Sequence, residues 1–178
     1  MAGGGDFRTA RRIAVYGVTG SGKTRAAEQI SLVTGSPWHS VDDLTWEPGW
    51  VEVPVDEQRR RIERICRGEA WIIDSMYGSW LDAVLSRVEV IVALDYPRGL
   101  SYRRLLRRTA HRMITRERFC NGNVESLRTV LARDSILWWH FRSFGHKRAR
   151  IRTWEADPRA PAVQRFTSPG QLMRALAG

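Results

Sequence analysis

One stretch constrains this chain more than any other: Gly17-Val-Thr-Gly-Ser-Gly-Lys-Thr24 matches G-x-x-x-x-G-K-[ST] without a mismatch. Its glycines let the backbone turn tightly, so that successive N–H groups point into one concavity that suits a phosphate. The lysine can reach the β- and γ-phosphates of a nucleotide, and the final threonine can ligate Mg²⁺. The motif therefore predicts binding of ATP with Mg²⁺. The residues expected to take part are Gly17, Thr19, Gly20, Ser21, Gly22, Lys23 and Thr24.

The residues around the motif supply the secondary structure that a phosphate-binding loop needs. Residues 12–16 form a short apolar run that is typical of a buried strand. After the motif, residues 25–32 place Ala26, Ala27 and Ile30 on one face of a helix. A strand, a glycine-rich turn and a helix in this order favour a true phosphate-binding loop over a chance glycine-rich loop.

Strands and helices alternate along the rest of the chain. Further apolar runs predict strands at 38–41, 70–74, 88–95 and 162–166. Helices are expected at 55–67, 80–85, from residue 97 onward, at 124–144 and at 169–176. This alternation requires right-handed crossovers and a parallel sheet with helices on both faces. The predicted fold class is therefore α/β, a three-layer P-loop NTPase fold on a five-stranded parallel sheet.

Length and composition fit one globular domain. The chain has 178 residues, of which 43% are hydrophobic and 27% are charged. We expect residues 1–10 to form a flexible tail, since they lack an apolar signal core, and residues 11–178 to form the domain. No run approaches the ~18 apolar residues of a membrane span. Two cysteines without a metal or disulfide pattern favour a reducing cytoplasm.

The charge balance is strongly basic, with a net charge of +10. Lysine and arginine concentrate in residues 98–118 and 142–152. Such charge fits polyanionic partners, whether nucleotides, phosphorylated small molecules or nucleic acid, and a solvated basic surface is the alternative. Because no nucleic-acid-binding motif is present, any binding to nucleic acid is expected to be weak and non-specific.

Beyond the P-loop, the layout resembles the adenylate kinase and shikimate kinase group of P-loop small-molecule kinases over roughly residues 11–177. The resemblance rests on Trp71-Ile-Ile-Asp74, on Val90–Pro97 running into a basic helix, and on the strand, loop and helix at 163–176. More closely, segments at 42–50, 95–98, 120–123 and 135–138 are similar to bacterial adenylate-kinase-related ATPases labelled topology-modulation proteins. The resemblance implies the strand order 2-3-1-4-5, a helical lid at about 115–124, and phosphoryl transfer from ATP with Mg²⁺.

The resemblance also implies roles for several side chains. Arg104 and Arg108, on the helix before the lid, would contact ATP, one against the adenine and one at the phosphates. An arginine that clamps the transferring phosphoryl group is expected after the lid, where Arg128 and Arg133 are available; Arg133 is the catalytic candidate. Ser168, which caps the last expected helix, is a further nucleotide-binding candidate. The lid has no four-cysteine zinc pattern, so no structural metal is expected.

Asp42 departs from the adenylate kinase pattern, which has an arginine after the second strand to hold an acceptor phosphate. A carboxylate repels an anionic acceptor but can accept a proton from a hydroxyl. Shikimate-, gluconate- and nucleoside-kinase-like enzymes have an acid at this position, so the resemblance implies a catalytic Asp42 and a small hydroxyl-bearing acceptor. The structural alternative is an Asx turn or a helix cap. The adjacent Asp43 should point elsewhere.

Three further points stay open at the level of sequence. Asp74 and Asp95 both follow apolar strands and compete for the magnesium-side role; the resemblance favours Asp74, together with Thr24, as the metal-site pair. Trp46 and Trp50 either stack on a substrate or pack against their own loop. The histidines at 111 and 140 read as ordinary helix residues.

Two main classes of function follow from these features. The first is an ATP-dependent phosphotransferase acting on a small hydroxyl-bearing substrate, supported by the P-loop and Asp42. The second is a nucleic-acid-associated ATPase, supported by the charge of the chain and its interleaved tryptophans and arginines. A nucleoside-monophosphate kinase is a third possibility, with the acceptor phosphate held by arginines of the 54–67 helix.

Overall fold

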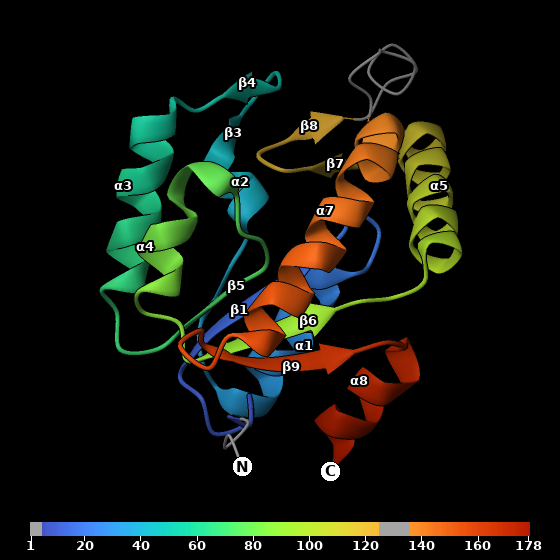
Figure 1. Ribbon diagram of the computed structural model, residues 1–178. Coiled ribbons are helices and arrows are strands. Elements are labelled where there is room, and N and C mark those ends of the chain that lie inside the picture. The colour runs from blue at the N-terminus through green and yellow to red at the C-terminus, as the bar shows by residue number, and fades with distance from the viewer. Residues whose placement is uncertain (1–4, 125–135) are drawn as a thin grey trace.

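Five parallel strands form the central sheet, in the order β2-β5-β1-β6-β9 (Figure 1). Their bounds are Arg12–Gly17 for β1, Trp38–His39 for β2, Trp71–Ile73 for β5, Val90–Leu94 for β6 and Ala162–Phe166 for β9. Counted along the chain within this sheet alone, the order reads 2-3-1-4-5. The predicted α/β fold class is confirmed in this computed structural model, which describes residues 5–124 and 136–178.

The central strands are buried along their length because helices cover both faces of the sheet. On one face, alternate strand residues such as Ala14, Ile73 and Ile91 pack against α3 (Val55–Cys66), α4 (Leu81–Leu85) and α7 (Ile136–Ala156). On the other face, Ile13, Ile72 and Val92 pack against α1 (Lys23–Thr34) and α8 (Pro169–Ala177). Alternate residues therefore serve two hydrophobic cores, one on each side of the sheet.

Smaller elements stand at the carboxyl edge of the sheet. They are α2 (Val41–Thr45), the 3₁₀ turn η1 (Gly78–Trp80), the hairpin β3 (Trp46–Glu47) with β4 (Val51–Glu52), and the hairpin β7 (Arg118–Phe119) with β8 (Asn123–Val124). The long helix α5 (Arg98–Thr115) leads from β6 to the second hairpin. In Figure 1, α7 crosses in front of the sheet between α3 with α4 on one side and α5 on the other. No helix in the described ranges is long and apolar enough to cross a bilayer.

Several expected boundaries are wrong. The second strand ends at His39 rather than Val41, because Ser40 accepts a hydrogen bond from the Asp43 N–H at 3.3 Å and caps α2. The helix expected at 124–144 is instead described from Ile136 to Ala156, and Val124 belongs to a strand. The helical lid expected at about 115–124 instead contains the β7–β8 hairpin.

The expected flexible tail is also wrong for the part of it that the structure describes. Phe7 is 1% exposed and packs edge-on against Phe166, with 6.3 Å between ring centroids. Its backbone N–H donates to the side-chain carbonyl of Gln164 at 3.1 Å. Burial of one aromatic side chain outweighs the flexibility that the preceding glycines suggest, so residues 6–10 belong to the domain. Residues 1–4 lie outside the described ranges.

Candidate active site

The P-loop joins β1 to α1 with the backbone geometry that its glycines allow. Gly20 and Gly22 have φ of 81° and 92°, a region that other residues rarely adopt. A side chain at Gly20 would also clash with the carbonyl oxygen of Ser101 on α5. Gly22 caps α1 without any side-chain hydrogen bond, so the first N–H groups of the helix are left for a ligand. This cradle fits an anionic phosphate chain.

Lys23 lies among two carboxylates and an arginine. Its Nζ donates to the Val18 carbonyl oxygen at 3.4 Å. Burial lowers the pKa of Lys23, the charges of Asp42 and Asp74 raise it, and the charge of Arg108 lowers it. The expected phosphate-binding lysine and the expected acceptor-side acid therefore share one electrostatic environment, although they come from different elements.

Thr24 and Asp74 form the most direct link between the P-loop and the neighbouring strand. The Thr24 hydroxyl donates to Oδ2 of Asp74 at 2.7 Å, and the Val41 N–H donates to Oδ1 at 2.9 Å. Asp74 is buried, and this burial raises its pKa against the effect of both hydrogen bonds. Thr24 and Asp74 could hold Mg²⁺, because a hydroxyl and a carboxylate are oxygen ligands of the kind that it prefers.

Asp95, the other candidate for the magnesium side, is engaged elsewhere. Its carboxylate lies 3.0 Å from Nε of Arg148 on α7 and 3.9 Å from Arg165 on β9. Arg165 also pairs with Glu155 at 3.1 Å. Of the two aspartates, Asp74 is the one that contacts the P-loop threonine, whereas Asp95 ties α7 and β9 to the end of β6.

Asp42 lies in the first turn of α2 and is held by two neighbours. The Tyr77 hydroxyl donates to its Oδ1 at 2.8 Å, and the Cys120 thiol lies 3.2 Å from its carbonyl oxygen. Burial, and then the charge of Asp42, raise the pKa of Tyr77, so its phenol stays protonated and serves as a donor. Sequence reasoning missed Tyr77 because it stands in an irregular loop with no fixed spacing from Asp42.

Arg104 and Arg108, on α5, both lie near the P-loop. Arg104 donates to the Ser21 carbonyl oxygen at 3.3 Å, and its guanidinium lies 5.8 Å from the Tyr96 ring centroid. Arg108 is half-buried, and its charge acts on Lys23. Arg104 therefore contacts the backbone of the loop, and Arg108 lies close enough to Lys23 for their charges to interact.

Of the two remaining candidates, the structure describes Ser168 but not Arg133. Arg133, like Arg128, lies outside the described residues. Ser168 caps α8 by accepting a hydrogen bond from the Gln171 N–H at 3.4 Å. That cap accounts for the serine by local helix structure, and its role in nucleotide binding stays a prediction.

Helix α7 contributes two contacts that sequence reasoning did not find. His140 is fully buried, and its Nδ1 lies 3.0 Å from the Thr19 carbonyl oxygen. Lys147 Nζ donates to the Gly17 carbonyl oxygen at 3.2 Å. The two residues are seven positions apart, which is close to two helical turns and puts them on one face. Helix α7 thus contacts two carbonyl oxygens of the P-loop.

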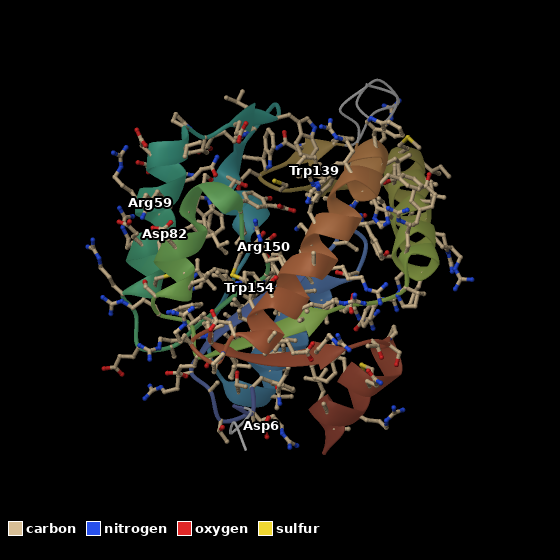
Figure 2. All side chains as sticks on the ribbon, viewed as in Figure 1. Asp6, Arg59, Asp82, Trp139, Arg150 and Trp154 are labelled. Carbon is tan, nitrogen blue, oxygen red and sulfur yellow. The ribbon has the colours of Figure 1, made fainter. Side chains whose placement is uncertain are left out.

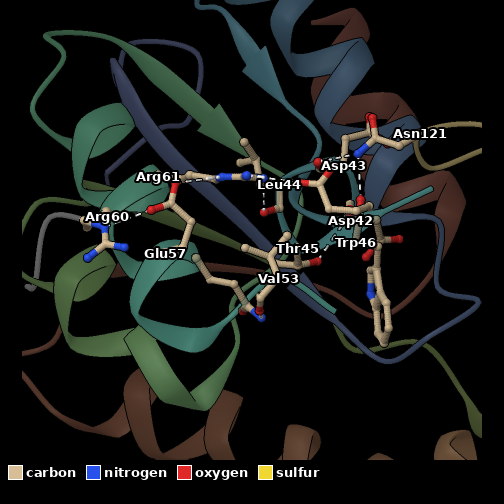
Figure 3. Close-up of polar contacts among 12 residues, drawn as sticks. Asp42, Asp43, Leu44, Thr45, Trp46, Val53, Glu57, Arg60, Arg61 and Asn121 are labelled. Atoms are coloured by element: carbon tan, nitrogen blue, oxygen red, sulfur yellow. Dashed lines mark hydrogen bonds and ion pairs between the residues drawn. The ribbon is translucent and has the colours of Figure 1, made fainter. Parts of the chain in front are cut away.

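The β7–β8 hairpin closes against the segment that carries Asp42. Asn121 donates to the carbonyl oxygens of Asp43 at 2.8 Å and Trp46 at 2.7 Å (Figure 3). Asn123 donates to the carbonyl oxygen of Glu47 at 3.0 Å. The expected lid region is therefore in contact with the acceptor-side segment.

Trp46 and Trp50 pack into this closure. Their ring centroids are 5.9 Å apart, and the Trp50 ring centroid is 5.5 Å from that of Phe119. Arg112 stacks over Phe119 at 3.7 Å, which joins α5 to the same cluster. The tryptophans therefore pack against each other and against the β7–β8 hairpin, and stacking on a substrate stays a prediction.

No protein-family model matches the sequence, and no curated protein matches it. Solved structures with the same fold include a shikimate kinase from Acinetobacter baumannii in complex with shikimate: TM-score 0.57, 14% identity, covering 96% of this chain and 91% of that chain. A gluconokinase from Sinorhizobium meliloti 1021 has a TM-score of 0.52 and 18% sequence identity, and the match covers 92% of this chain and 87% of that chain. A deoxyadenosine kinase from M. mycoides has a TM-score of 0.53 and 12% sequence identity, and the match covers 93% of this chain and 94% of that chain. The chain therefore has the fold of the P-loop kinases.

Proposed function

We propose that this chain is an ATP- and Mg²⁺-dependent phosphotransferase whose acceptor is a hydroxyl group of a small molecule. The observation that carries the proposal is the position of Asp42. Its carboxylate is oriented by Tyr77 and acts electrostatically on Lys23, whose P-loop is the cradle for the phosphates. A base on one side and a phosphate cradle on the other leave a place for an acceptor between them.

The proposed roles follow from this arrangement. The P-loop N–H groups and Lys23 bind the β- and γ-phosphates, and Arg108 adds charge that is most useful in the transition state. Thr24 and Asp74 would hold Mg²⁺, which supplies further charge neutralisation when bound. Asp42 accepts the acceptor's O–H proton as that oxygen bonds to the γ-phosphorus. The bond between the γ-phosphorus and the β-bridging oxygen breaks, and ADP leaves.

A phosphorylated acceptor fits this site poorly. The carboxylate of Asp42 would repel it, and three of the four arginines of α3, the helix expected to hold it, are engaged in ion pairs. Arg59 pairs with Asp82 (Figure 2) and also with Glu63. Arg60 and Arg61 pair with Glu57 (Figure 3). Arg61 also pairs with Glu47 at 2.9 Å. These contacts favour a hydroxyl acceptor over a nucleoside monophosphate.

The test is phosphoryl transfer to panels of acceptors, with products identified by ³¹P NMR. Polyols, hydroxy acids and nucleosides would give phosphate monoesters, whereas nucleoside monophosphates would give diphosphates. We expect a monoester with one of the hydroxyl panels, and loss of that product in Asp42→Asn while Mg·ATP still binds. Efficient phosphorylation of AMP or CMP that Asp42→Asn leaves intact would contradict the proposal.

A nucleic-acid-associated ATPase, the activity suggested by the topology-modulation resemblance, is the second candidate. It is favoured by the exposed indoles of Trp138 and Trp139 beside basic residues on α7. Against it, Lys147 and Arg148 of the same basic segment contact the P-loop and Asp95. We therefore propose only weak, sequence-independent binding, which should fall steeply between 50 and 200 mM salt. DNA-stimulated ATP hydrolysis without any acceptor would reverse this ranking.

For the location, a reducing, ATP-containing cytoplasm suits either activity and the two free cysteines.

A further inference from the structure

Lys147 stands at the junction of α7 and the P-loop. Its Nζ donates to the Gly17 carbonyl oxygen at 3.2 Å and lies 5.0 Å from the Tyr16 ring centroid. The side chain is half-buried, between the end of β1 and the body of α7. A carbonyl oxygen and an aromatic face are weak replacements for the water that an ammonium group loses there.

The charges around Lys147 come from three elements. Lys23 on α1 and Arg150 on α7 are both positive, and Asp42 on α2 is the opposing carboxylate. Figure 2 shows Arg150 on the side of α7 that faces α2. Beyond these groups, the neighbouring Asp95 is already paired with Arg148. The local balance is therefore positive before any anion enters.

This setting changes the protonation of the amine. Burial is the main cause that lowers the pKa of Lys147, to about 7, and the charges of Lys23 and Arg150 act in the same direction. Above that pH the free protein holds mostly a neutral amine, which can still donate a hydrogen bond to Gly17.

We propose that Lys147 is a second phosphate-binding lysine beside Lys23, which takes up a proton from solvent when phosphoryl groups bind over the P-loop. The proposal rests on the function proposed above and adds a proton to its binding step. The negative charge of the phosphates would offset the repulsion from Lys23 and Arg150, and would favour the ammonium form of Lys147. The loop would then present two lysines to the phosphates, one from α1 and one from α7.

The alternative is a purely structural lysine that braces the Gly17 carbonyl, as His140 braces that of Thr19. A structural lysine keeps the same hydrogen bond, and the same protonation, before and after binding. The two roles therefore differ in a quantity other than activity, the number of protons bound with the nucleotide.

The experiment is calorimetric titration of the full chain with the Mg²⁺ complex of a non-hydrolysable ATP analogue at pH 8, in buffers of different ionisation enthalpy. At one pH unit above the pKa of about 7, the free amine is roughly one-tenth charged, so Lys147 would add roughly 0.9 proton per nucleotide. In Lys147→Arg the charge is permanent, so this uptake should vanish while affinity changes less than about threefold. In Lys147→Gln both the uptake and about tenfold of the affinity should be lost.

Protons bound by other groups, Lys23 among them, remain in every variant, so the difference between wild type and Lys147→Arg isolates the Lys147 contribution. Arg152→Met removes one charge from an exposed position of the same helix and should keep the wild-type uptake. Equal uptake in wild type and Lys147→Arg would overturn this proposal and leave the phosphotransferase standing. Failure of the wild type to bind the analogue at all would instead overturn both.

Discussion

The Tyr77 hydroxyl donates a 2.8 Å hydrogen bond to Oδ1 of Asp42, so under the proposed function Oδ2 is the oxygen that would meet an acceptor. Tyr77 comes from the loop after β5 and Asp42 from the first turn of α2. This pairing fixes the rotation of the carboxylate, and it makes Tyr77 a positioning residue for the proposed base.

Tyr77→Phe should lower kcat for the acceptor on the order of tenfold and leave the KM for ATP unchanged, because it frees the carboxylate to rotate without removing it. Asp42→Asn should lower kcat further, since it removes the base itself. Steady-state kinetics with both substrates varied gives the two constants. Tyr102→Phe, on a ring that packs against Phe141 instead, is the matched control. A raised KM for ATP in Tyr77→Phe would contradict the assignment.

Lys23→Ala should reduce turnover on the order of 10²-fold or more, because it removes a charge from the developing phosphoryl transition state. Turnover and Mg·ATP affinity are measured together, by coupled assay and by calorimetry. Arg64→Ala removes one charge from an exposed position on α3 and should leave both values near wild type. Unchanged hydrolysis and binding in Lys23→Ala would exclude the P-loop as the nucleotide site.

Arg108→Ala should weaken turnover more than nucleotide binding, since the arginine faces Lys23 and its charge matters most when charge moves between phosphates. The expected loss in kcat is on the order of 10²-fold, with a KM change below about fivefold. The neighbouring Arg107 is exposed on the same helix, so Arg107→Ala serves as the control. Equal losses in the two variants would show that α5 contributes only general positive charge.

Asp74→Asn should make the ligand-free protein more stable while it lowers Mg²⁺-dependent turnover at least tenfold. Burial raises the folded-state pKa of Asp74 above its unfolded value, so ionisation at neutral pH costs folding free energy. The gain should be present at pH 7 and should shrink as the pH falls towards the unfolded value near 4.

Urea unfolding at pH 7 and pH 4 measures the Asp74 effect. Asp95→Asn is the contrasting variant: it breaks the ion pairs with Arg148 and Arg165 and should lower stability at pH 7. A loss of stability in Asp74→Asn as large as that in Asp95→Asn would mean that the Asp74 carboxylate is structural.

Phe7→Ala should lower the free energy of unfolding by about 3–4 kcal/mol, because the ring is buried against Phe166. Deleting residues 1–10 should have at least this effect, whereas the exposed substitution Arg8→Ala should cost little. Denaturant unfolding curves compare the three. If deletion of residues 1–10 leaves the midpoint unchanged, the domain begins at residue 11 after all.

Sequence alone predicted the sheet well because its central strands, such as Val90–Leu94, are continuous apolar runs, which are typical of strands buried on both faces and not of exposed elements. It failed at Val41, where a serine cap outweighed an apolar run. It also failed for His140 and Lys147, since a polar residue on the inner face of a basic helix looks like any solvated one. Their partners are carbonyls of a loop more than 120 residues away, which no local pattern encodes.

The hairpin that closes on the Asp42 segment is attached by side chains that end on main-chain atoms. Cys120 contacts the carbonyl of Asp42, Asn121 those of Asp43 and Trp46, and Asn123 that of Glu47. These hydrogen bonds do not depend on which side chains residues 42–47 carry, and within that range only the Trp46 ring is described as also packing towards the hairpin, through Trp50. Under the proposed function, substitutions of exposed side chains such as Asp43 could therefore change the acceptor preference while the hairpin keeps its hydrogen bonds to the segment.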